Sequence, residues 1–274
     1  MHSTASDGSL PPERVVERAL AAGLAAIALT DHDTVAGVPA ALAAGTRLGL
    51  RVISGCEFSA AAPWGEMHVL GYFLPPDSPA LETFLERCRA DRVRRGREMV
   101  DRLQRLGLEV SFDDVLREAA GGAVGRPHVA RALARRGHVP EAGDAFDRWL
   151  GRGRPAFVHK VLPEFREIAD LVHARHGLVS VAHLKDRGTR AFLERLKQEG
   201  LDAVETRHPS HDPDARARLT GLALQLGLLR TGGSDWHGDP DGGAPHDPLG
   251  SQAVPAEWLD RLDDRRGALV EASR

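Results

Sequence analysis

Histidines and carboxylates recur beside short apolar runs in this chain, at positions from which they could bind metal ions. Six such runs can be recognised, and five of them end or begin with His, Asp or Glu. The residues concerned are Asp31, His32, Glu57, His68, His183, Asp235 and His237, and the opening residues add His2 and Asp7. Imidazoles with several carboxylates suit zinc, manganese or iron, and more than one ion. The sequence therefore predicts a site for several metal ions.

The spacing of these residues refines the choice of ligands. Asp235 and His237 are two residues apart, so in an extended segment both side chains point the same way. Asp31 and His32 are adjacent, so we expect His32 to be the ligand and Asp31 to support it by hydrogen bonding. Asp33 is expected to cap the next helix. A lone histidine is usually structural or exposed, and we expect this of His138, His159, His173, His176 and His246.

The composition argues against a protein nucleophile and against a secreted or membrane protein. The two cysteines, Cys56 and Cys88, lack CxxC spacing, so we expect neither a disulfide framework nor a thiolate zinc site. No serine lies in a nucleophile elbow. No stretch approaches ~18 uninterrupted apolar residues, and no signal peptide can be recognised. We therefore expect a cytoplasmic protein with no membrane partner and no obligatory protein partner.

Helical patterns alternate with the apolar runs. Helices are expected at about 11–23, 36–49, 163–177, 188–200 and 212–227. Such alternation is typical of βα units with parallel strands, and βα barrels carry their sites on the rim where the strands end. A length of 274 residues fits one barrel with an insertion. We therefore predict an α/β, barrel-like fold.

Residues 78–154 differ from the rest of the chain and are predicted to form an all-helical insertion subdomain. The barrel would then consist of residues 1–77 and 155–274. Residues 86–154 contain 16 arginines, no lysine and 11 acidic residues, a net charge of +5. This charge has two readings: solvated faces of ordinary helices, or a basic cover over a site for an acidic substrate.

Several segments together resemble a known family. HSTASDG, TDHDT, GCEFS, HVLGYF, VAH and GGSDWHG, in this order, resemble the PHP family, named for polymerase and histidinol phosphatase domains. GRPHVARAL, FDRWLGRGRPAFV and HPSHDPDARARL are similar to its nucleotide phosphoesterase branch. The resemblance implies a distorted TIM-like barrel of seven strands, a helical insertion, and hydrolysis of nucleoside 3′,5′-bisphosphates or of 5′-phosphorylated RNA, one nucleotide at a time.

The resemblance also implies which residues hold which ion. His2, Glu57 and Asp235 would bind one metal, Glu57 would bridge to a second held by His68 and His183, and a third would be held by Asp7, His32 and His237. Two or three divalent ions are expected, with manganese favoured over zinc and iron. Glu57 and Asp235 would act in catalysis through a hydroxide shared by the ions, which attacks phosphorus in line.

Three further residues are predicted to bind substrate phosphate: Arg126, His128 and His211. The arginine fork matches phosphate oxygens, and a histidine beside it could donate to the same group. The alternative for Arg126 is a plain loop-to-helix junction, with Pro127 at the first helical position. His211 and His208 could equally be ordinary polar residues of a loop.

One departure from the family pattern concerns the opening motif. The family has a strand followed by His-x-His, and here only the second histidine is present, as His2. Two explanations are open: the natural protein lacks this strand and histidine, or the start is assigned downstream of the natural one. We favour the second, and in either case expect the first strand to be missing and the first metal site to be impaired. Histidinol-phosphate phosphatase is an alternative activity, and a degenerate, non-catalytic module that binds metal or nucleic acid is an alternative class.

Overall fold

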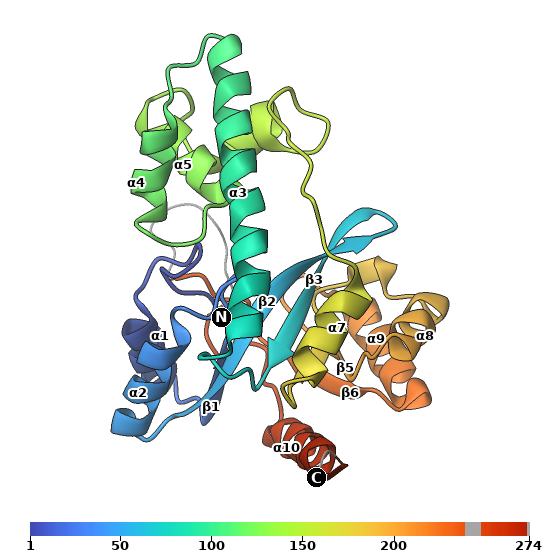
Figure 1. Cartoon of the computed structure of the whole chain (residues 1–274). Helices are drawn as coiled ribbons and strands as arrows, with labels where there is room; N and C mark the ends of the chain where they lie inside the picture. The colour runs from blue at the N-terminus through green and yellow to red at the C-terminus, as the bar shows by residue number, and fades with distance from the viewer. Residues whose placement is uncertain (239–247, 273–274) are drawn as a thin grey trace.

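The computed structural model describes residues 1–238 and 248–272, which form a curled sheet flanked by helices, with a helical arm on one side (Figure 1). The strands are β1 Ala26–Leu29, β2 Arg51–Ala62, β3 Gly65–Tyr72, β4 Leu178–Val181, β5 Ala203–Arg207 and β6 Leu229–Gly232. Around the sheet lie α1 Pro12–Ala21, α2 Val38–Leu48, α7 Phe165–His173, η2 Lys185–Arg187, α8 Arg190–Gln198, α9 Pro213–Leu226 and α10 Ala256–Ala272. The α/β fold and the five helices predicted beside the strands are confirmed.

The strands pair in the order β1-β2-β3-β4-β5-β6. β1 is parallel to β2, and β4, β5 and β6 are parallel to one another. β3 is antiparallel to both of its neighbours, so the prediction of parallel pairing is wrong there. Only Pro63 and Trp64 separate β2 from β3. This connection is too short for a parallel pair, because parallel neighbours need a crossover of about a dozen residues or more.

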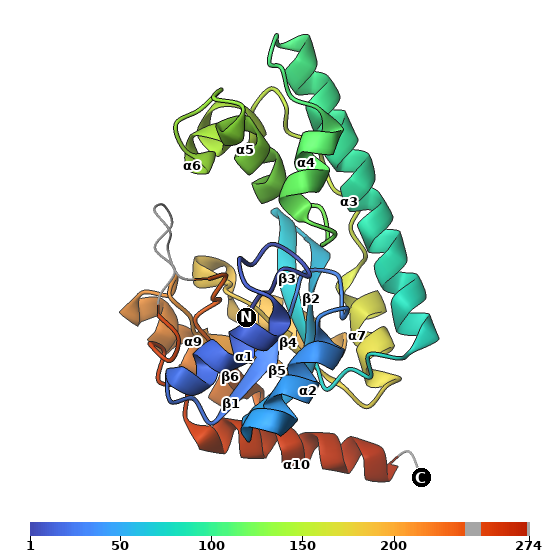
Figure 2. The ribbon, with the colours of Figure 1, turned by 90° about the vertical axis from the view of Figure 1, so that its left-hand side faces the viewer.

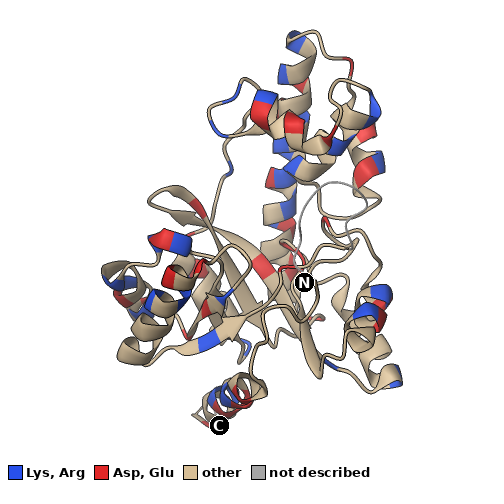
Figure 3. Ribbon diagram, turned by 180° about the vertical axis from the view of Figure 1, so that it is seen from behind, with Lys and Arg blue, Asp and Glu red and all other residues tan. Residues whose placement is uncertain are grey.

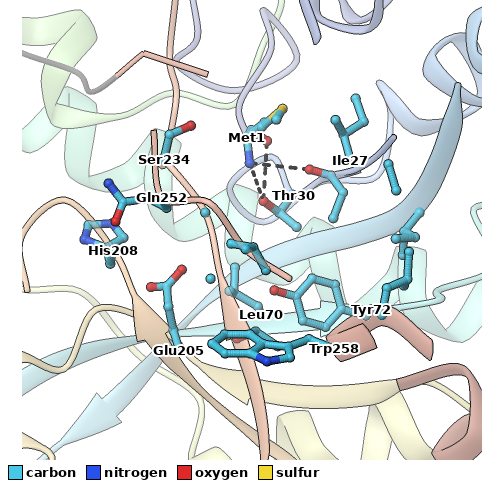
Figure 4. Close-up of a pocket in the computed structure, with 18 of the residues that line it drawn as sticks. Met1, Ile27, Thr30, Leu70, Tyr72, Glu205, His208, Ser234, Gln252 and Trp258 are labelled. Carbon is cyan, nitrogen blue, oxygen red and sulfur yellow. Dashed lines mark hydrogen bonds between the residues drawn. The ribbon is translucent and has the colours of Figure 1, made fainter. Parts of the chain in front are cut away.

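Among the residues described, the sheet has six strands, one fewer than the resemblance implies, and β1 and β6 are its edges. An apolar cavity of about 340 Å³ lies between these edges, with Ile27, Leu70, Tyr72 and Trp258 in its lining (Figure 4). Helix α10, which the sequence analysis did not predict, runs below the sheet (Figure 2). The expectation of an upstream start stays a prediction.

The arm is built from α3 Pro79–Arg105, α4 Phe112–Ala119, α5 Arg126–Arg135, α6 Ala142–Ala145 and the π-helix η1 Phe146–Leu150. It has a hydrophobic core of its own, which includes Leu103, Val115 and Leu133. The first turns of α3 pack instead on the sheet, where Leu81 and Leu85 join the core of the barrel. Arginines are spread along the arm and interleaved with acidic residues (Figure 3). The boundaries at 78 and 154 stay a prediction.

Strand β2 shows how the sheet places a charged residue in the interior. Residues 55–60 of this strand are all buried. Cys56 and Phe58 point into the hydrophobic core, and the side chain of Glu57 therefore points to the opposite face.

None of the described helices is both long and apolar enough to cross a membrane.

Candidate metal centre

The loop formed by residues 1–10 crosses the rim of the sheet, and Asp31 holds it there. Ser3 donates its backbone N–H and its hydroxyl to the two oxygens of Asp31, at 2.7 Å each, and the Ser6 hydroxyl donates to Asp31 Oδ1 at 2.7 Å. The His2 N–H donates to the Trp236 carbonyl at 2.9 Å, which ties this loop to the one after β6. Asp31 thus supports the loop that carries two of the predicted ligands.

Glu57 lies at the centre of the predicted ligands. His2 Nε2 is 2.9 Å from Glu57 Oε2 and 3.1 Å from Asp235 Oδ1. On the other side of the carboxylate, His68 Nδ1 is 2.6 Å and His183 Nε2 is 3.3 Å from Glu57 Oε1. One carboxylate with an imidazole on each oxygen is an arrangement that can bridge two ions.

A second carboxylate, Asp7, gathers the remaining ligands. His237 Nε2 is 3.4 Å from Asp7 Oδ1, and His32 Nε2 is 3.9 Å from Asp7 Oδ2. The His237 ring is oriented by its Nδ1, which donates to the Asp235 carbonyl at 2.8 Å. Since that carbonyl can only accept, the lone pair of His237 lies on Nε2, the nitrogen that faces Asp7.

These atoms fall into overlapping sets. Three groups of ligand atoms each lie within 4.8 Å of one another: His2, Asp7, His32 and His237; His32, Glu57 and His68; and His2, Glu57 and Asp235. Seven of the eight predicted ligands fall in these groups, and the eighth, His183, lies beside them with its Nε2 3.3 Å from Glu57 Oε1. The grouping differs in two respects from the one that the resemblance implies: His32 belongs to the Glu57 and His68 group as well as to the Asp7 group, and His183 lies outside the three groups.

Unsatisfied ring nitrogens test whether these residues fit metal ions. His2 Nε2, His32 Nδ1 and His68 Nδ1 are buried and make no hydrogen bond among the described residues. Buried polar atoms in folded proteins nearly always have a partner. Because these nitrogens point at carboxylate oxygens without forming proper hydrogen bonds, the cluster fits cations bound between them.

The electrostatics of the cluster keep its carboxylates charged. Burial alone would raise the pKa of Glu57, but the four imidazoles around it, those of His32, His68, His183 and His2, outweigh burial and hold the pKa well below its usual value. The pKa values of Asp7 and Asp235 are likewise lowered despite burial. Ionised carboxylates at neutral pH are the form that binds metal.

The histidines of the cluster differ from one another. Burial lowers the pKa of His32 to about 3, so its ring is neutral. Burial acts in the same direction on His2 and His68, but their carboxylate neighbours raise the pKa values to about 10 and about 9. Without metal, these two rings therefore carry protons at neutral pH.

Sequence reasoning missed the residues that support His68. Glu66 Oε1 accepts from His68 Nε2 at 3.2 Å and also from the Lys160 ammonium, which donates to Ser59 Oγ at 2.9 Å as well. Burial and the nearby Arg92 lower the pKa of Lys160 to about 8. Glu66 stands two residues before His68 on β3, a spacing that placed both on one face and was the available signal.

Asp33 does not cap the following helix, so that expectation is wrong. Its carboxylate accepts from Arg92 Nε at 2.7 Å and from the Ser59 N–H at 3.2 Å. Helix α2 begins with Gly37 as its N-cap residue, without a side-chain hydrogen bond. Asp33 instead joins the rim of the barrel to Arg92 of α3.

Of the predicted phosphate ligands, Arg126 is free to act. Its guanidinium lies 6.0 Å from the Phe146 ring centre and 5.7 Å from that of Phe157, and it has no carboxylate partner among the described residues. Arg95 is buried close by, and burial together with the charges of Arg126 and Arg92 lowers its pKa to about 10. The arm thus holds positive charge that protein carboxylates do not fully neutralise.

His128 and His211 have their ring nitrogens engaged by the backbone. His128 Nδ1 accepts from the Gly125 N–H at 2.9 Å, and the ring also bonds the Ser6 backbone, which ties the arm to the metal-site loop. His211 Nε2 accepts from the Lys185 N–H at 3.3 Å, and Nδ1 lies 3.4 Å from the Thr206 carbonyl. These bonds give both rings backbone partners, and phosphate binding by His128 and His211 stays a prediction.

The histidines expected to have no role in the site are not among these ligands. His173, for example, pairs with Asp202 at 2.7 Å. His138 Nε2 lies 3.0 Å from the Glu109 carbonyl in the arm. His246 lies outside the described residues.

Comparisons with known proteins agree with this geometry. The model of the PHP domain matches residues 1–206. A 5′-3′ exoribonuclease of Haemophilus influenzae is 33% identical over 241 residues, 86% of this chain and 88% of the relative. A 3′,5′-nucleoside bisphosphate phosphatase of Chromobacterium violaceum is 32% identical over 251 residues, 88% of this chain and 87% of the relative.

A solved structure extends the likeness to three dimensions. The crystal structure of a proposed metal-dependent phosphoesterase from Bifidobacterium adolescentis superposes with a TM-score of 0.88. It is 32% identical, and the match covers 96% of this chain and 94% of the other. Its fold, the convergent ligands and the family match lead to one conclusion: the chain belongs to the PHP domain family.

Proposed function

We propose that this chain hydrolyses phosphate esters of nucleotides, either removing phosphate from nucleoside 3′,5′-bisphosphates or releasing nucleotides from 5′-phosphorylated RNA ends. The observation that carries the proposal is the convergence of eight potential metal ligands around Glu57 and Asp7, below an arm with incompletely neutralised arginines. Relatives named 5′-3′ exoribonuclease and 3′,5′-nucleoside bisphosphate phosphatase support this substrate class.

The proposal assigns two or three divalent ions to the cluster, with manganese favoured over zinc and iron. His2, Glu57 and Asp235 would hold one, Glu57, His68 and His183 a second, and Asp7, His32 and His237 a third. When bound, such ions lower the pKa of water and neutralise phosphoryl oxygens. Glu57 and Asp235 would act in catalysis by fixing the positions of these ions. The two free cysteines support a cytoplasmic location.

Arg126 is the proposed phosphate-binding residue of the arm. A guanidinium that lacks a carboxylate partner can bind phosphate oxygens through two parallel N–H donors. We expect Arg126→Gln to raise the KM for the bisphosphate by about tenfold, while metal content and melting temperature stay unchanged. Steady-state kinetics check this. An unchanged KM would show that the substrate does not reach this arginine.

The activity itself is tested with purified protein and manganese. Phosphate should be released from adenosine 3′,5′-bisphosphate, or mononucleotides from a short 5′-phosphorylated RNA, and EDTA should abolish both reactions. The Glu57→Gln variant, which lacks the bridging charge, serves as the inactive control. Protein that holds its metals and hydrolyses neither substrate would contradict the proposal.

The two alternatives are separated in the same experiment. Histidinol phosphate assayed beside the bisphosphate identifies the first, since a preference for it would replace the nucleotide substrate. Metal counting identifies the second, because a non-catalytic module without metals would return no ions per chain. Two or three ions with nucleotide hydrolysis would exclude both.

A further inference from the structure

His208 is a buried histidine beside the metal centre that no predicted ligand set includes. It lies in the loop after β5, with a side chain only 8% exposed. Its ring centre is 5.2 Å from that of His183, and its Nε2 is 3.5 Å from Asp235 Oδ2. Figure 4 shows the ring on the polar side of the cavity, close to Gln252 and above Glu205. His208 thus lies between His183 and Asp235, which are proposed ligands of two different ions.

Backbone contacts decide which nitrogen of His208 carries the hydrogen. The Ser210 N–H donates to His208 Nδ1 at 3.0 Å. A backbone N–H can only donate, so Nδ1 holds the lone pair and the hydrogen of the neutral ring is on Nε2. His237 is the opposite case, because its Nδ1 donates to a carbonyl and leaves a lone pair on Nε2. His208 therefore presents an N–H donor to the metal centre, whereas His237 presents a lone pair.

The Nε2–H of His208 lacks a good partner within the described residues. The atom is buried and forms no proper hydrogen bond, and the distance of 3.5 Å to Asp235 Oδ2 exceeds the usual range of about 2.7 to 3.2 Å. His211, three residues later, has both ring nitrogens engaged by the backbone instead. An unsatisfied donor that faces a metal centre suits an anionic oxygen and repels a cation.

We propose that His208 donates a hydrogen bond from Nε2 to an oxygen of the phosphoryl group being transferred, and that it is not a metal ligand. This inference rests on the proposed function. The Ser210 bond fixes the ring before substrate arrives, so the donor is already oriented when negative charge develops on the phosphoryl oxygens. His208 is thus a catalytic residue that works as a hydrogen-bond donor with a fixed direction.

The test compares two substitutions. His208→Gln keeps an N–H donor at a similar reach, and His208→Leu removes it. With manganese and the bisphosphate, we expect His208→Leu to lower kcat about 100-fold with a KM within threefold, and His208→Gln to recover at least tenfold of that loss. The matched control is His176→Asn, before β4 at the opposite end of that strand from His183, where the backbone φ of 54° suits asparagine. Its kcat should stay within twofold.

Four readouts separate this role from a structural or metal-binding one. Metal content and melting temperature should not change in either His208 variant, and loss of an ion in His208→Leu would overturn the proposal. In zinc-loaded protein, nitrogen NMR should find the His208 hydrogen on Nε2, and inorganic phosphate should shift that signal. Calorimetry should give phosphate binding about tenfold weaker in His208→Leu.

The calorimetry also distinguishes the two proposals. Weaker phosphate binding in His208→Leu, with no nucleotide hydrolysis by the wild-type protein, would support His208 as a phosphate donor and overturn the proposed substrate. Normal hydrolysis and normal phosphate binding in His208→Leu would overturn the role of His208 and leave the proposed function standing.

Discussion

For each histidine around Glu57, the nitrogen that can bind metal depends on which ring nitrogen already makes a hydrogen bond. Glu66 holds Nε2 of His68, which leaves Nδ1 facing Glu57, and the Asp235 carbonyl holds Nδ1 of His237. Such outer contacts fix the orientation of metal-binding rings and raise their basicity. By the same argument, the charge of Glu66 should strengthen metal binding by His68.

The Glu66→Gln variant tests this. Loss of the carboxylate charge should make His68 a weaker ligand and lower the affinity for one ion about 10- to 100-fold, with the other ions little affected. Titration of metal-free protein with manganese measures each step. Glu194→Gln, which alters an exposed pair with Arg190 on α8, is the control. Equal affinity in both variants would contradict the role of Glu66.

Metal affinity should also depend on pH. The pKa values of His2 and His68 are raised above the ordinary 6.5, to about 10 and about 9, so both rings are protonated near neutrality in the metal-free protein. Metal binding must displace these protons, so affinity should rise as pH increases from 7 to 9, by about tenfold per unit for each proton released. Calorimetry in buffers of different ionisation enthalpy counts the protons. Proton-free binding would contradict the assignment.

At the residue scale, the sequence indicated which side chains come together where the candidate ligands follow strands, and metal binding by them stays a prediction. His32, Glu57 and His183 could be found because each stands beside an apolar run, and the fold brings those ends together. His208 and Lys160 could not be found in this way, because their roles depend on contacts made only in three dimensions. Lys160 is 94 residues from its partner Glu66 in sequence.

Among the elements, the opening loop depends on a residue outside it. Asp31 follows β1 and accepts three hydrogen bonds from Ser3 and Ser6, while Gly8 lies so close to His2 that an added Cβ would come within 2.5 Å of the His2 carbonyl. These contacts hold the loop in a compact path that brings His2 and Asp7 together, with His2 Nδ1 3.8 Å from Asp7 Oδ1.

Asp31→Ala should damage both stability and metal binding. It leaves three donors without their charged acceptor, and a loss of roughly 3 kcal/mol in the free energy of unfolding is expected. Urea denaturation of the metal-free protein measures this loss, and titration shows whether ions held by His2 and Asp7 weaken as well. Asp186→Ala, at an exposed position in η2, should change neither quantity. A variant as stable as the wild type would contradict this account of the loop.

Element boundaries on the barrel were predictable, and the β2–β3 hairpin and α10 were not. The five predicted helices have regular apolar spacing and neighbouring strands. The hairpin was misjudged because alternation of strands and helices was extended to a connection of only two residues. Helix α10 covers the sheet with few buried residues, Trp258 and Leu262, so its periodic signal is weak.

For the molecule as a whole, the arm is tied to the metal site rather than hinged away from it. Arg92 pairs with Asp33 at 2.6 Å, His128 bonds the Ser6 backbone, and the Ala123 N–H donates to the Ala5 carbonyl at 3.0 Å. A change that unfolds the opening loop would therefore also loosen the arm that carries Arg126.

The cavity between β1 and β6 predicts a stabilising substitution. Ala28 of β1 lines this cavity and has room for a larger side chain. Ala28→Val should stabilise the protein by about 1 kcal/mol, because it fills apolar space and adds a β-branched residue to a strand. Thermal unfolding measures the gain. Ala28→Ser is the control and should give none, and a lower melting temperature for the valine variant would show that the cavity is smaller in solution.

The same opening has a consequence for self-association. Strand edges that face solvent can pair with other molecules and lead to aggregation. Here the two edges of the described sheet face one cavity, and Trp258, Leu259 and Leu262 of α10 line it from below. Arg230 and Arg207 lie over the Trp258 ring and add cation–π contacts that hold the helix in place. Helix α10 thus covers the cavity between the two strand edges and should reduce aggregation through them.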